Sequence, residues 1–388
     1  MSKKIILLFS IFLCATPLLH AQDVTVDEEI DDASPWIVRA AKWGFHLLTD
    51  PSSRLDTAYI YHTPLRWMGG LETTHISSTV DLHSDVKESA LPGSGTLASA
   101  EYGMDFSLQK RLYHKVGASF GYGGLSGGYG VEVGGRTKDR NSYFSLGLSG
   151  NSVGVQIQNY VIKEYIEKTG GPYGQNALSD YPGRLRDFAV DAYYVFNNRR
   201  FAYSAAYKGA KIQRRSVGSW MVSGRYLLGD LTVDERDKAF LEITDRLGRY
   251  ITNQVSLGGG YSFNWVLLHR DPTDWSKSKG LRNLTLNLTT LPMASVYTHV
   301  DSYHFQEEGK EPFQTHFDGK LALALQAHAA LGFCWDRFSV NVQAHYNRFG
   351  FDHATQTLRD QQRGLRYDVD SGARFQDLTA KVQFYVRF

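Results

Sequence analysis

Residues 376–388, at the C-terminus, alternate between two kinds of side chain. The apolar parity consists of Leu378, Ala380, Val382, Phe384, Val386 and Phe388. The polar parity consists of Thr379, Lys381, Gln383, Tyr385 and Arg387. Because successive side chains of a β-strand point to opposite faces, the segment predicts a strand with one apolar and one polar face. The apolar face continues to the final aromatic residue, whereas the ends of soluble domains are usually polar and frayed.

This pattern is typical of the closing strand of an outer-membrane β-barrel. Hydrocarbon offers no water to unpaired backbone groups, so a strand in a barrel wall must be paired to its end. The composition agrees, because the 388 residues include 23 Tyr, 21 Phe and 37 Gly but only 10 Pro, and aromatic residues form girdles at both rims of such barrels. After the N-terminus, no run of about 20 apolar residues is present, which argues against a helical membrane protein.

Residues 1–21 predict a secretory signal peptide. Lys3 and Lys4 precede an apolar run over residues 5–19, and Ala21 is the small residue before the expected cleavage site. Loss of these two lysines from the 42 basic residues would balance the 40 acidic ones. A neutral chain argues against nucleic acid as a partner, because phosphate binding needs a net basic surface.

The mature chain is expected to have two parts. Residues 22–54 predict a periplasmic leader with a short amphipathic helix, and residues 55–388 predict the barrel. Helical spacing in the leader relates Trp36, Ala40, Trp43 and Leu47. Only Cys334 would remain after cleavage, so no intramolecular disulfide is expected. The expected location is the outer membrane, reached by export through the signal peptide.

The connectors between alternating runs appear in two lengths. Short turns are expected near Lys110, Gly150, Asn197, Leu291 and Asp336. The Asn197–Asn198 pair predicts a tight hairpin, since Asn tolerates positive φ, with a returning strand over residues 201–207. Long polar connectors are expected over residues 83–96, 124–141, 161–184, 267–281, 301–319 and 350–375.

Short turns at one end and long loops at the other are typical of bacterial outer-membrane barrels. Residues 229–250 break the rule, because they are long where a short turn is due, and 234–247 are compatible with a small helix. Counting the strands along the chain predicts an all-β fold, a closed antiparallel transmembrane β-barrel of about 14 strands, with about 12 as the alternative.

Four short segments resemble a known family. They are Asp56-Thr57-Ala58-Tyr59-Ile60 leading to Trp67, Ser216-Val217-Gly218-Ser219-Trp220, the glycine-rich stretch 258–264, and Val386-Arg387-Phe388. From about Leu55 to the C-terminus, the chain resembles the domain-of-unknown-function 4421 family of Bacteroidetes secreted proteins. The resemblance implies an outer-membrane barrel and no particular activity, because none is assigned to the family. Ala58 departs from the Asn of the family pattern.

Three groups of residues invite a chemical interpretation. The glycine-rich run 121–130 fails as a nucleotide loop, because no helix pattern follows it, and glycines of a strand bend or surface loop are the preferred interpretation. Ser339, Asn341, Gln343 and His345 share one strand face. Ser339 and His345 are about 20 Å apart at strand rise, so an acyl-transfer site would need a partner such as His328 or Ser256 from a neighbouring strand.

A third group consists of His299, His304 and His316, with Asp301, Glu307 and Glu308 nearby. These residues fall in or near one predicted long loop. Imidazole and carboxylate groups bind metals, but the spacing matches no closed ligand set. A solvated loop is the preferred interpretation, with a metal site as the alternative, and no catalytic residue, cofactor or metal ligand is assigned.

The polar strand faces supply a set of candidate lumen-lining residues: Glu101, Asp105, Gln326, His328, Gln343, His345, Lys381 and Arg387. This mixed set favours neither ion sign, and barrels of about 12 to 14 strands have narrow or filled lumens. We therefore expect a narrow channel or a plugged, structural barrel with long extracellular loops. The alternatives are a barrel enzyme acting on lipid or lipopolysaccharide, and a surface-binding module that uses its loops.

The expected partners follow from the same interpretation. They are outer-membrane lipid, lipopolysaccharide and, through Phe388, the barrel-assembly machinery. No nucleic acid is expected, and the oligomeric state is left open.

Overall fold

The computed structural model describes residues 55–90, 99–133, 141–162, 167–169, 184–208, 211–232, 235, 247–274, 276–305, 313–319, 321–352, 356–360 and 365–388. The chain divides into residues 1–45 and 46–388, and every described residue belongs to the second unit. The predicted signal peptide, the leader with its helix, and most of the possible helix at 234–247 lie outside the described residues. In the described part of the chain, no helix is both long enough and apolar enough to cross a membrane.

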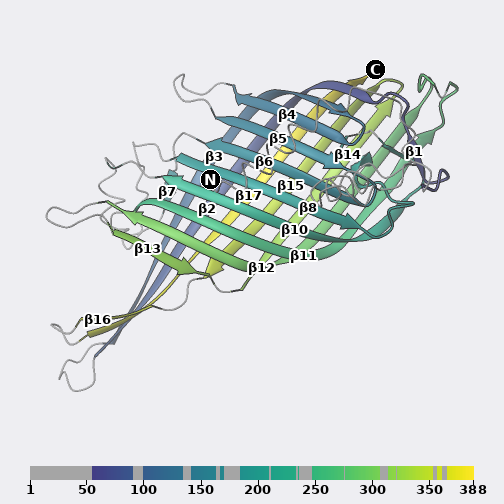
Figure 1. The fold of residues 1–388 in the computed structure, drawn as a ribbon. Helices are drawn as coiled ribbons and strands as arrows, with labels where there is room; N and C mark the ends of the chain where they lie inside the picture. The colour runs from purple at the N-terminus through teal and green to yellow at the C-terminus, as the bar shows by residue number, and fades with distance from the viewer. Residues whose placement is uncertain are drawn as a thin grey trace, which may run out of the picture. The chain divides into compact units, whose positions relative to one another are not determined.

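The alternating segments form one antiparallel sheet that closes on itself (Figure 1). Twelve strands of the described chain make the wall: β2 (Trp67–Ala90), β3 (Ser99–Tyr122), β4 (Leu125–Glu132), β5 (Ser142–Ser149), β6 (Val153–Ile162), β8 (Arg184–Val195), β10 (Val217–Thr232), β11 (Leu247–Arg270), β12 (Arg282–His304), β14 (Ala322–Trp335), β15 (Phe338–Asp352) and β17 (Leu365–Arg387). β17 pairs with β2, and β11 pairs with β12, so both seams are sealed. The alternative of 12 strands is confirmed, and the preferred count of 14 is wrong.

The two surplus turns lie inside long strands, each of which contains a β-bulge. Lys110 lies inside β3, where the register against β2 shifts between Ile76 and Ser78. Leu291 lies inside β12, paired with Gln326, and β12 contains a register shift near Ser295. A bulge inserts one residue and reverses the parity of the side chains. In the sequence, this reversal looks the same as a turn between two strands.

The end of the barrel that contains Trp67 and Phe388 is called the turn end here, and the opposite end is called the loop end. The turn at residues 150–152 and the Asp336–Arg337 turn confirm two of the predicted short connectors. The glycine-rich run forms a third turn, with Gly123 at a φ of +57°, followed by β4. The predicted loop 267–281 is wrong, because β11 continues to Arg270 and residues 271–281 connect at the turn end.

The exception at 229–250 is also resolved, because β3 is one strand, β4 is an additional wall strand and residues 201–207 are not a wall strand. β10 ends at Thr232 and β11 begins at Leu247, so this long connector lies at the loop end, where long connectors are expected. Three short strands extend the sheet at that end: β7 (Glu167–Thr169), β13 (Phe313–Asp318) and β16 (Gln356–Asp360). They pair with β3, β12 and β17 respectively.

The wall has an apolar outer face and a polar inner face over most of its height. On β15 and β17, Val342 and Val382 are 46% and 40% exposed. The residues of the opposite parity, such as Asn341 and Gln383, are buried. On β14 the outer face carries Leu323, which is 86% exposed. The arrangement matches a wall that faces hydrocarbon on the outside and polar groups on the inside.

Nearer the loop end, the inner face is apolar instead. Side chains from strands on opposite sides of the barrel pack against one another there: Ile76, Leu185, Ala189, Leu227, Leu231, Val300, Phe349, Phe351, Ala373 and Phe375. The rings of Phe349 and Phe375 stack with centroids 4.8 Å apart and an interplanar angle of 5°. We call these ten residues the apolar lumen cluster. Since it joins β8 and β10 to β15 and β17, it fills the lumen at this height.

The connector 196–216 is the largest departure from the predicted topology. The Asn197–Asn198 hairpin with a returning strand is wrong, because β8 pairs directly with β10 and the residues between them fold into the lumen. This segment, called the insert here, contains the 3-10 helix η3 (Tyr203–Ala205) and the strand β9 (Lys211–Gln213). β9 pairs with β1 (Ile60–His62), so the residues before the wall also join the insert.

Candidate functional site

The candidate site is the lumen around the insert. Phe201 and Ala206 are fully buried there, and Tyr207 is 6% exposed. The Tyr203 hydroxyl and His328 Nδ1, on β14, are 2.9 Å apart in a hydrogen bond. The ring of Tyr203 also packs against Tyr193 of β8 at 4.8 Å. One residue of the insert therefore contacts both sides of the barrel.

Tyr207 is the main anchor of the insert. Its backbone carbonyl accepts hydrogen bonds from Asn341 Nδ2 at 2.9 Å and from Gln343 Nε2 at 2.8 Å. Its hydroxyl donates to Asn287 Oδ1 at 2.8 Å. These partners lie on β15 and β12, so one residue links the insert to two wall strands. A buried hydrogen-bond network of this kind favours one arrangement of the groups that it joins.

A buried ion pair lies beside this anchor. Lys381 Nζ is 3.0 Å from Glu72 Oε2, and the two side chains are 12% and 2% exposed. Gln383 donates to the same carboxylate oxygen at 2.8 Å and accepts from Gln343 at 2.8 Å. The charge pair is therefore connected through two amides to the carbonyl of Tyr207. Buried charges in proteins are tolerated when they are paired and hydrogen-bonded in this way.

A second charged pair connects this polar layer to the apolar lumen cluster. Arg225 Nη1 lies 3.8 Å from Asp191 Oδ1, and Gln326 donates to the same oxygen at 2.9 Å. The guanidinium of Arg225 lies over the ring of Phe349, 5.8 Å from its centroid. Polar and apolar layers are thus in direct contact along the lumen.

Two small cavities lie beside the insert within the described residues, with volumes of about 70 and 80 Å³. Both are lined by Tyr193, Tyr203, His328, His345 and Lys381 among other residues. Cavities of this size hold a few water molecules. Neither is large enough for a metabolite, which typically occupies several hundred Å³.

The predicted lumen-lining residues fall into three groups. Gln326, His328, Gln343, His345 and Lys381 come together around the two cavities. Arg387 is fully buried at the turn end, where its Nη2 is 3.0 Å from Cys334 Sγ. Glu101 and Asp105 lie on β3, in a part of the strand whose side chains are outside the described structure.

The structure does not assemble the considered acyl-transfer site in the described part of the chain. Ser339 Oγ is buried and has no hydrogen-bond partner among the described residues. His328 bonds to Tyr203, and Ser256 bonds to Ser295 at 3.1 Å. Neither Ser339 nor Ser256 is therefore hydrogen-bonded to a histidine that could activate it as a nucleophile.

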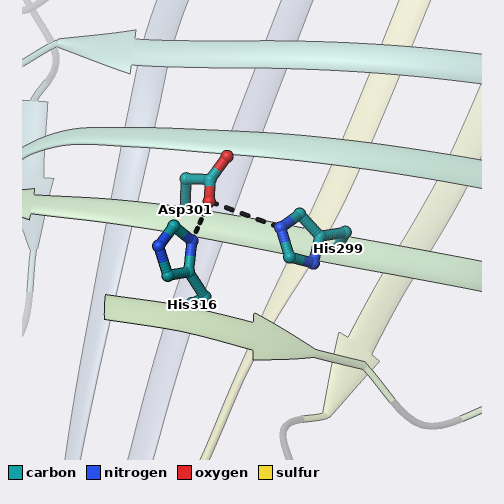
Figure 2. Close-up of side chains that lie close together, drawn as sticks. All are labelled: His299, Asp301 and His316. Atoms are coloured by element: carbon teal, nitrogen blue, oxygen red, sulfur yellow. Dashed lines mark hydrogen bonds and ion pairs between the residues drawn. The ribbon is translucent and has the colours of Figure 1, made fainter. Parts of the chain in front are cut away.

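The histidine group at the loop end lies on paired strands and not in a loop, which corrects the sequence interpretation. His299 and Asp301 lie on β12, and His316 lies on the paired strand β13. Figure 2 shows the Asp301 carboxylate between the two imidazoles, with dashed lines from it to both. One nitrogen or oxygen from each of the three side chains lies within 4.8 Å of the others, which is a geometry that can hold a metal ion.

Sequence reasoning missed the residues of the insert. Phe201, Tyr203 and Tyr207 alternate as a strand would, and this alternation was the misleading signal. The informative signal is the other parity, which carries Ala202, Ser204 and Ala206. Small residues on both sides of aromatic ones suit a segment that is enclosed on every side, whereas a wall strand has a face of large apolar residues for lipid.

Comparisons with known proteins give the following similarities. A protein-family model described as Domain of unknown function (DUF4421) matches residues 54–375. No curated protein matches the chain. The outer membrane protease OmpT from Escherichia coli is similar at 9% identity, over 84% of this chain and 98% of that chain, with a TM-score of 0.36. A Pseudomonas aeruginosa FadL homologue is similar at 10% identity, over 84% and 93% of the two chains, with a TM-score of 0.18. At these TM-scores, the evidence for the barrel is the strand pairing of this chain itself.

Proposed function

The chain belongs to the Domain of unknown function (DUF4421) family, and from that membership we propose that it is an integral outer-membrane β-barrel closed by its own insert. The observation that carries the proposal is the anchor at Tyr207, whose carbonyl and hydroxyl bind β15 and β12 across the lumen. In this function, the barrel is a structural element of the envelope that presents long connectors at one face. It does not form an open pore.

The outer surface supports the membrane location. Large apolar side chains are exposed on adjacent wall strands, among them Leu257, Leu288, Leu323, Leu331, Val342, Leu378, Val382 and Phe384. Aromatic residues such as Trp67, Trp220 and Tyr297 lie on the same surface, and a barrel in a bilayer uses such residues at its two interfaces. Covering this surface with lipid removes it from water, which a soluble protein would have to achieve by burial in a core.

The orientation and the route to the membrane belong to the same proposal. The turn end faces the periplasm and the loop end faces outward, since short turns are periplasmic in barrels of this class. Export uses residues 1–21, assembly uses Phe388, and the surrounding molecules are lipid and lipopolysaccharide. The resemblance of the segments around Asp56, Ser216 and Gly258 supports an origin in the Bacteroidetes envelope.

Two features favour a closed lumen rather than a narrow channel. The insert occupies the turn half of the lumen, and the apolar lumen cluster fills the height nearer the loop end. An ion would have to pass both layers, and the second layer offers it no polar partner, so its desolvation would cost several kcal/mol.

Bilayer recordings test the proposal. Purified protein reconstituted into planar bilayers should give no conductance steps, and vesicles that contain it should retain an entrapped sugar. A matched 16-stranded porin supplies the positive control for insertion and recording. Steady conductance from the folded wild-type protein would contradict closure. A change in the composition of the vesicle lipid or lipopolysaccharide during incubation would favour the barrel enzyme instead.

A further inference from the structure

The histidine group at the loop end is a square of four facing side chains. β12 and β13 pair antiparallel, with Asp301 opposite His316 and His299 opposite Asp318. Residues two apart on a strand share a face, so all four side chains project from the same side of this two-strand unit. His299 Nδ1 lies 2.8 Å from Asp318 Oδ1, and His316 Nδ1 lies 2.5 Å from Asp301 Oδ1. His299 Nε2 is 3.4 Å from that same Asp301 oxygen.

The square lies on the outer wall, beyond the apolar belt. The neighbours Thr298 and Val300 are buried inside the barrel at 3% and 0% exposure, and Tyr297 is 51% exposed on the outside. The bulge near Ser295 produces this arrangement, because it turns the odd-numbered residues of β12 outward from Tyr297 onward. The four polar side chains therefore follow directly after an aromatic residue at the loop-side boundary of the belt.

No permanent cation neutralises the two carboxylates within the described chain. The ion pairs of Asp301 and Asp318 are with histidines alone. Arg249, which is two residues along β11 from the partner of Asp301, is engaged with Asp230 at 2.7 Å. A divalent cation bound between two such adjacent carboxylates would neutralise the charge of both.

The donor set and its spacing select the class of cation. Two imidazole nitrogens with carboxylate oxygens suit a borderline transition metal such as Zn²⁺ and do not suit Ca²⁺ or Mg²⁺, which take oxygen ligands. In a tetrahedron with bonds of about 2.0–2.1 Å, neighbouring ligand atoms are roughly 3.3 Å apart. The 3.4 Å separation of His299 Nε2 and Asp301 Oδ1 already has this value. His316 Nδ1, which is 2.5 Å from the same oxygen, has to move by a side-chain rotation, which its 58% exposure permits.

We propose that His299, Asp301 and His316 bind one zinc-class divalent ion on the outer wall, with water as the fourth ligand. Asp318, bonded to His299 Nδ1 at 2.8 Å, orients the ring whose Nε2 holds the ion. The ion joins β13 to β12, so it fixes the short strand that extends the wall beyond the membrane boundary. This site is independent of the lumen, and its presence or absence leaves the proposed closure of the barrel unaffected.

Metal analysis of the folded protein tests the site. The mature chain is prepared without a polyhistidine tag, stripped with a chelator, loaded with ZnSO₄ and desalted, and its zinc is measured by mass spectrometry and its affinity by calorimetry. We expect one zinc ion per chain. Asp301→Asn and His316→Ala should each weaken binding by at least tenfold, as loss of groups that hold a metal does. Replacement by Co²⁺ should give the visible bands of a four-coordinate site.

The matched control is His83→Ala. His83 also pairs with a carboxylate, that of Asp352, at 3.3 Å. Neither residue belongs to the metal-binding group of His299, Asp301 and His316. The His83→Ala variant should therefore bind zinc as the wild type does. Retention of the barrel is checked by the heat-dependent mobility shift on gels, and His316 is exposed enough for its replacement to leave the fold intact. Wild-type protein that retains no more zinc than Asp301→Asn, or equal losses in His83→Ala and His316→Ala, would overturn the site.

Discussion

The insert can be released by a single substitution, Tyr207→Ala. The ring of Tyr207 is buried, 5.0 Å from the ring of Tyr203 and 5.9 Å from that of His345. Removing a buried ring of this size costs about 3–5 kcal/mol in lost contacts and cavity formation. Asn287 Oδ1 keeps a hydrogen bond from Thr289 at 2.9 Å, so loss of the hydroxyl adds little. Since 1.4 kcal/mol is about a factor of ten, the undocked population should rise by roughly 10² to 10³-fold.

Cys334 is a natural reporter of undocking. It is a free cysteine, 2% exposed, and it packs against Ile212 of β9 and Leu281. A bulky maleimide can reach this thiol only after β9 leaves. In the folded mature chain, the labelling rate of Tyr207→Ala should therefore exceed that of wild type by the same 10² to 10³-fold.

The matched control is Tyr207→Phe, which keeps the ring and removes only the bond to Asn287. It costs about 1 kcal/mol, so its labelling should rise by tenfold at most. Unfolded protein in denaturant gives the upper limit of the rate. The account of the insert is refuted if Tyr207→Ala and wild type label at equal rates, or if folded wild type labels as fast as the denatured chain.

Three further predictions concern the wall, the ion pair and the turn end. Val342→Arg places a charge on the lipid-facing surface and should lower the free energy of unfolding by about 2–4 kcal/mol near the bilayer midplane, measured by denaturant titration in lipid vesicles; no loss would show that this face is not in lipid. Lys381→Met leaves Glu72 as an unpaired buried charge and should lower the free energy of unfolding by about 3–5 kcal/mol in the same titration. The double variant Glu72→Gln, Lys381→Met should recover most of this loss, and equal free energies for the single and double variants would contradict an energetic coupling of Glu72 and Lys381. Burial, helped by Lys211 and Arg66, lowers the pKa of His62 to about 4. Its neutral form therefore stabilises the docked β1–β9 sheet fully above pH 6.5, and this contribution is lost as the pH falls through 4. Hydrogen exchange of the β1–β9 amides should lose protection over this window in wild type and much less in His62→Gln, and pH-independent protection would contradict the assignment.

The wall was predictable because lipid imposes a simple rule. Every second residue of a spanning strand is apolar, so residues 376–388 and the hairpin at Asp336–Arg337 could be recognised from the sequence alone. The rule fails where a strand bulges, since a bulge at Ile76 or Ser295 shifts the parity without ending the strand. The division of β3 and of β12 and the false strand at 201–207 add three strands to the predicted count, and the unrecognised β4 removes one, which gives 14 predicted strands against the 12 of the wall.

The lumen was much less predictable. Its contents depend on contacts between residues far apart in the chain, such as Tyr207 with Asn341 and Tyr203 with His328, and no local pattern encodes them. The arrangement of the histidine group could not be predicted for a related reason. Asp301 and His316 face each other only because of the register of β12 and β13. In the sequence, Asp301 is two residues from His299 and fifteen from His316, and this spacing matches no known set of metal ligands.

Spin-label accessibility along β15 tests the central claim most directly, because it reports the outer and inner faces in one measurement. Nitroxides are placed singly at residues 339, 340, 342 and 344 in a Cys334→Ser background, in lipid vesicles, and Asn341 and Gln343 are left intact because they hold the insert. The account predicts that labels at Val340, Val342 and Ala344 collide with oxygen dissolved in the bilayer, and that the label at Ser339, which is buried on the inner face, is shielded from both oxygen and a water-soluble nickel complex. Collision of the nickel complex with the label at 339 would show an open, water-filled lumen, and shielding of 342 from oxygen would show that this face does not meet lipid.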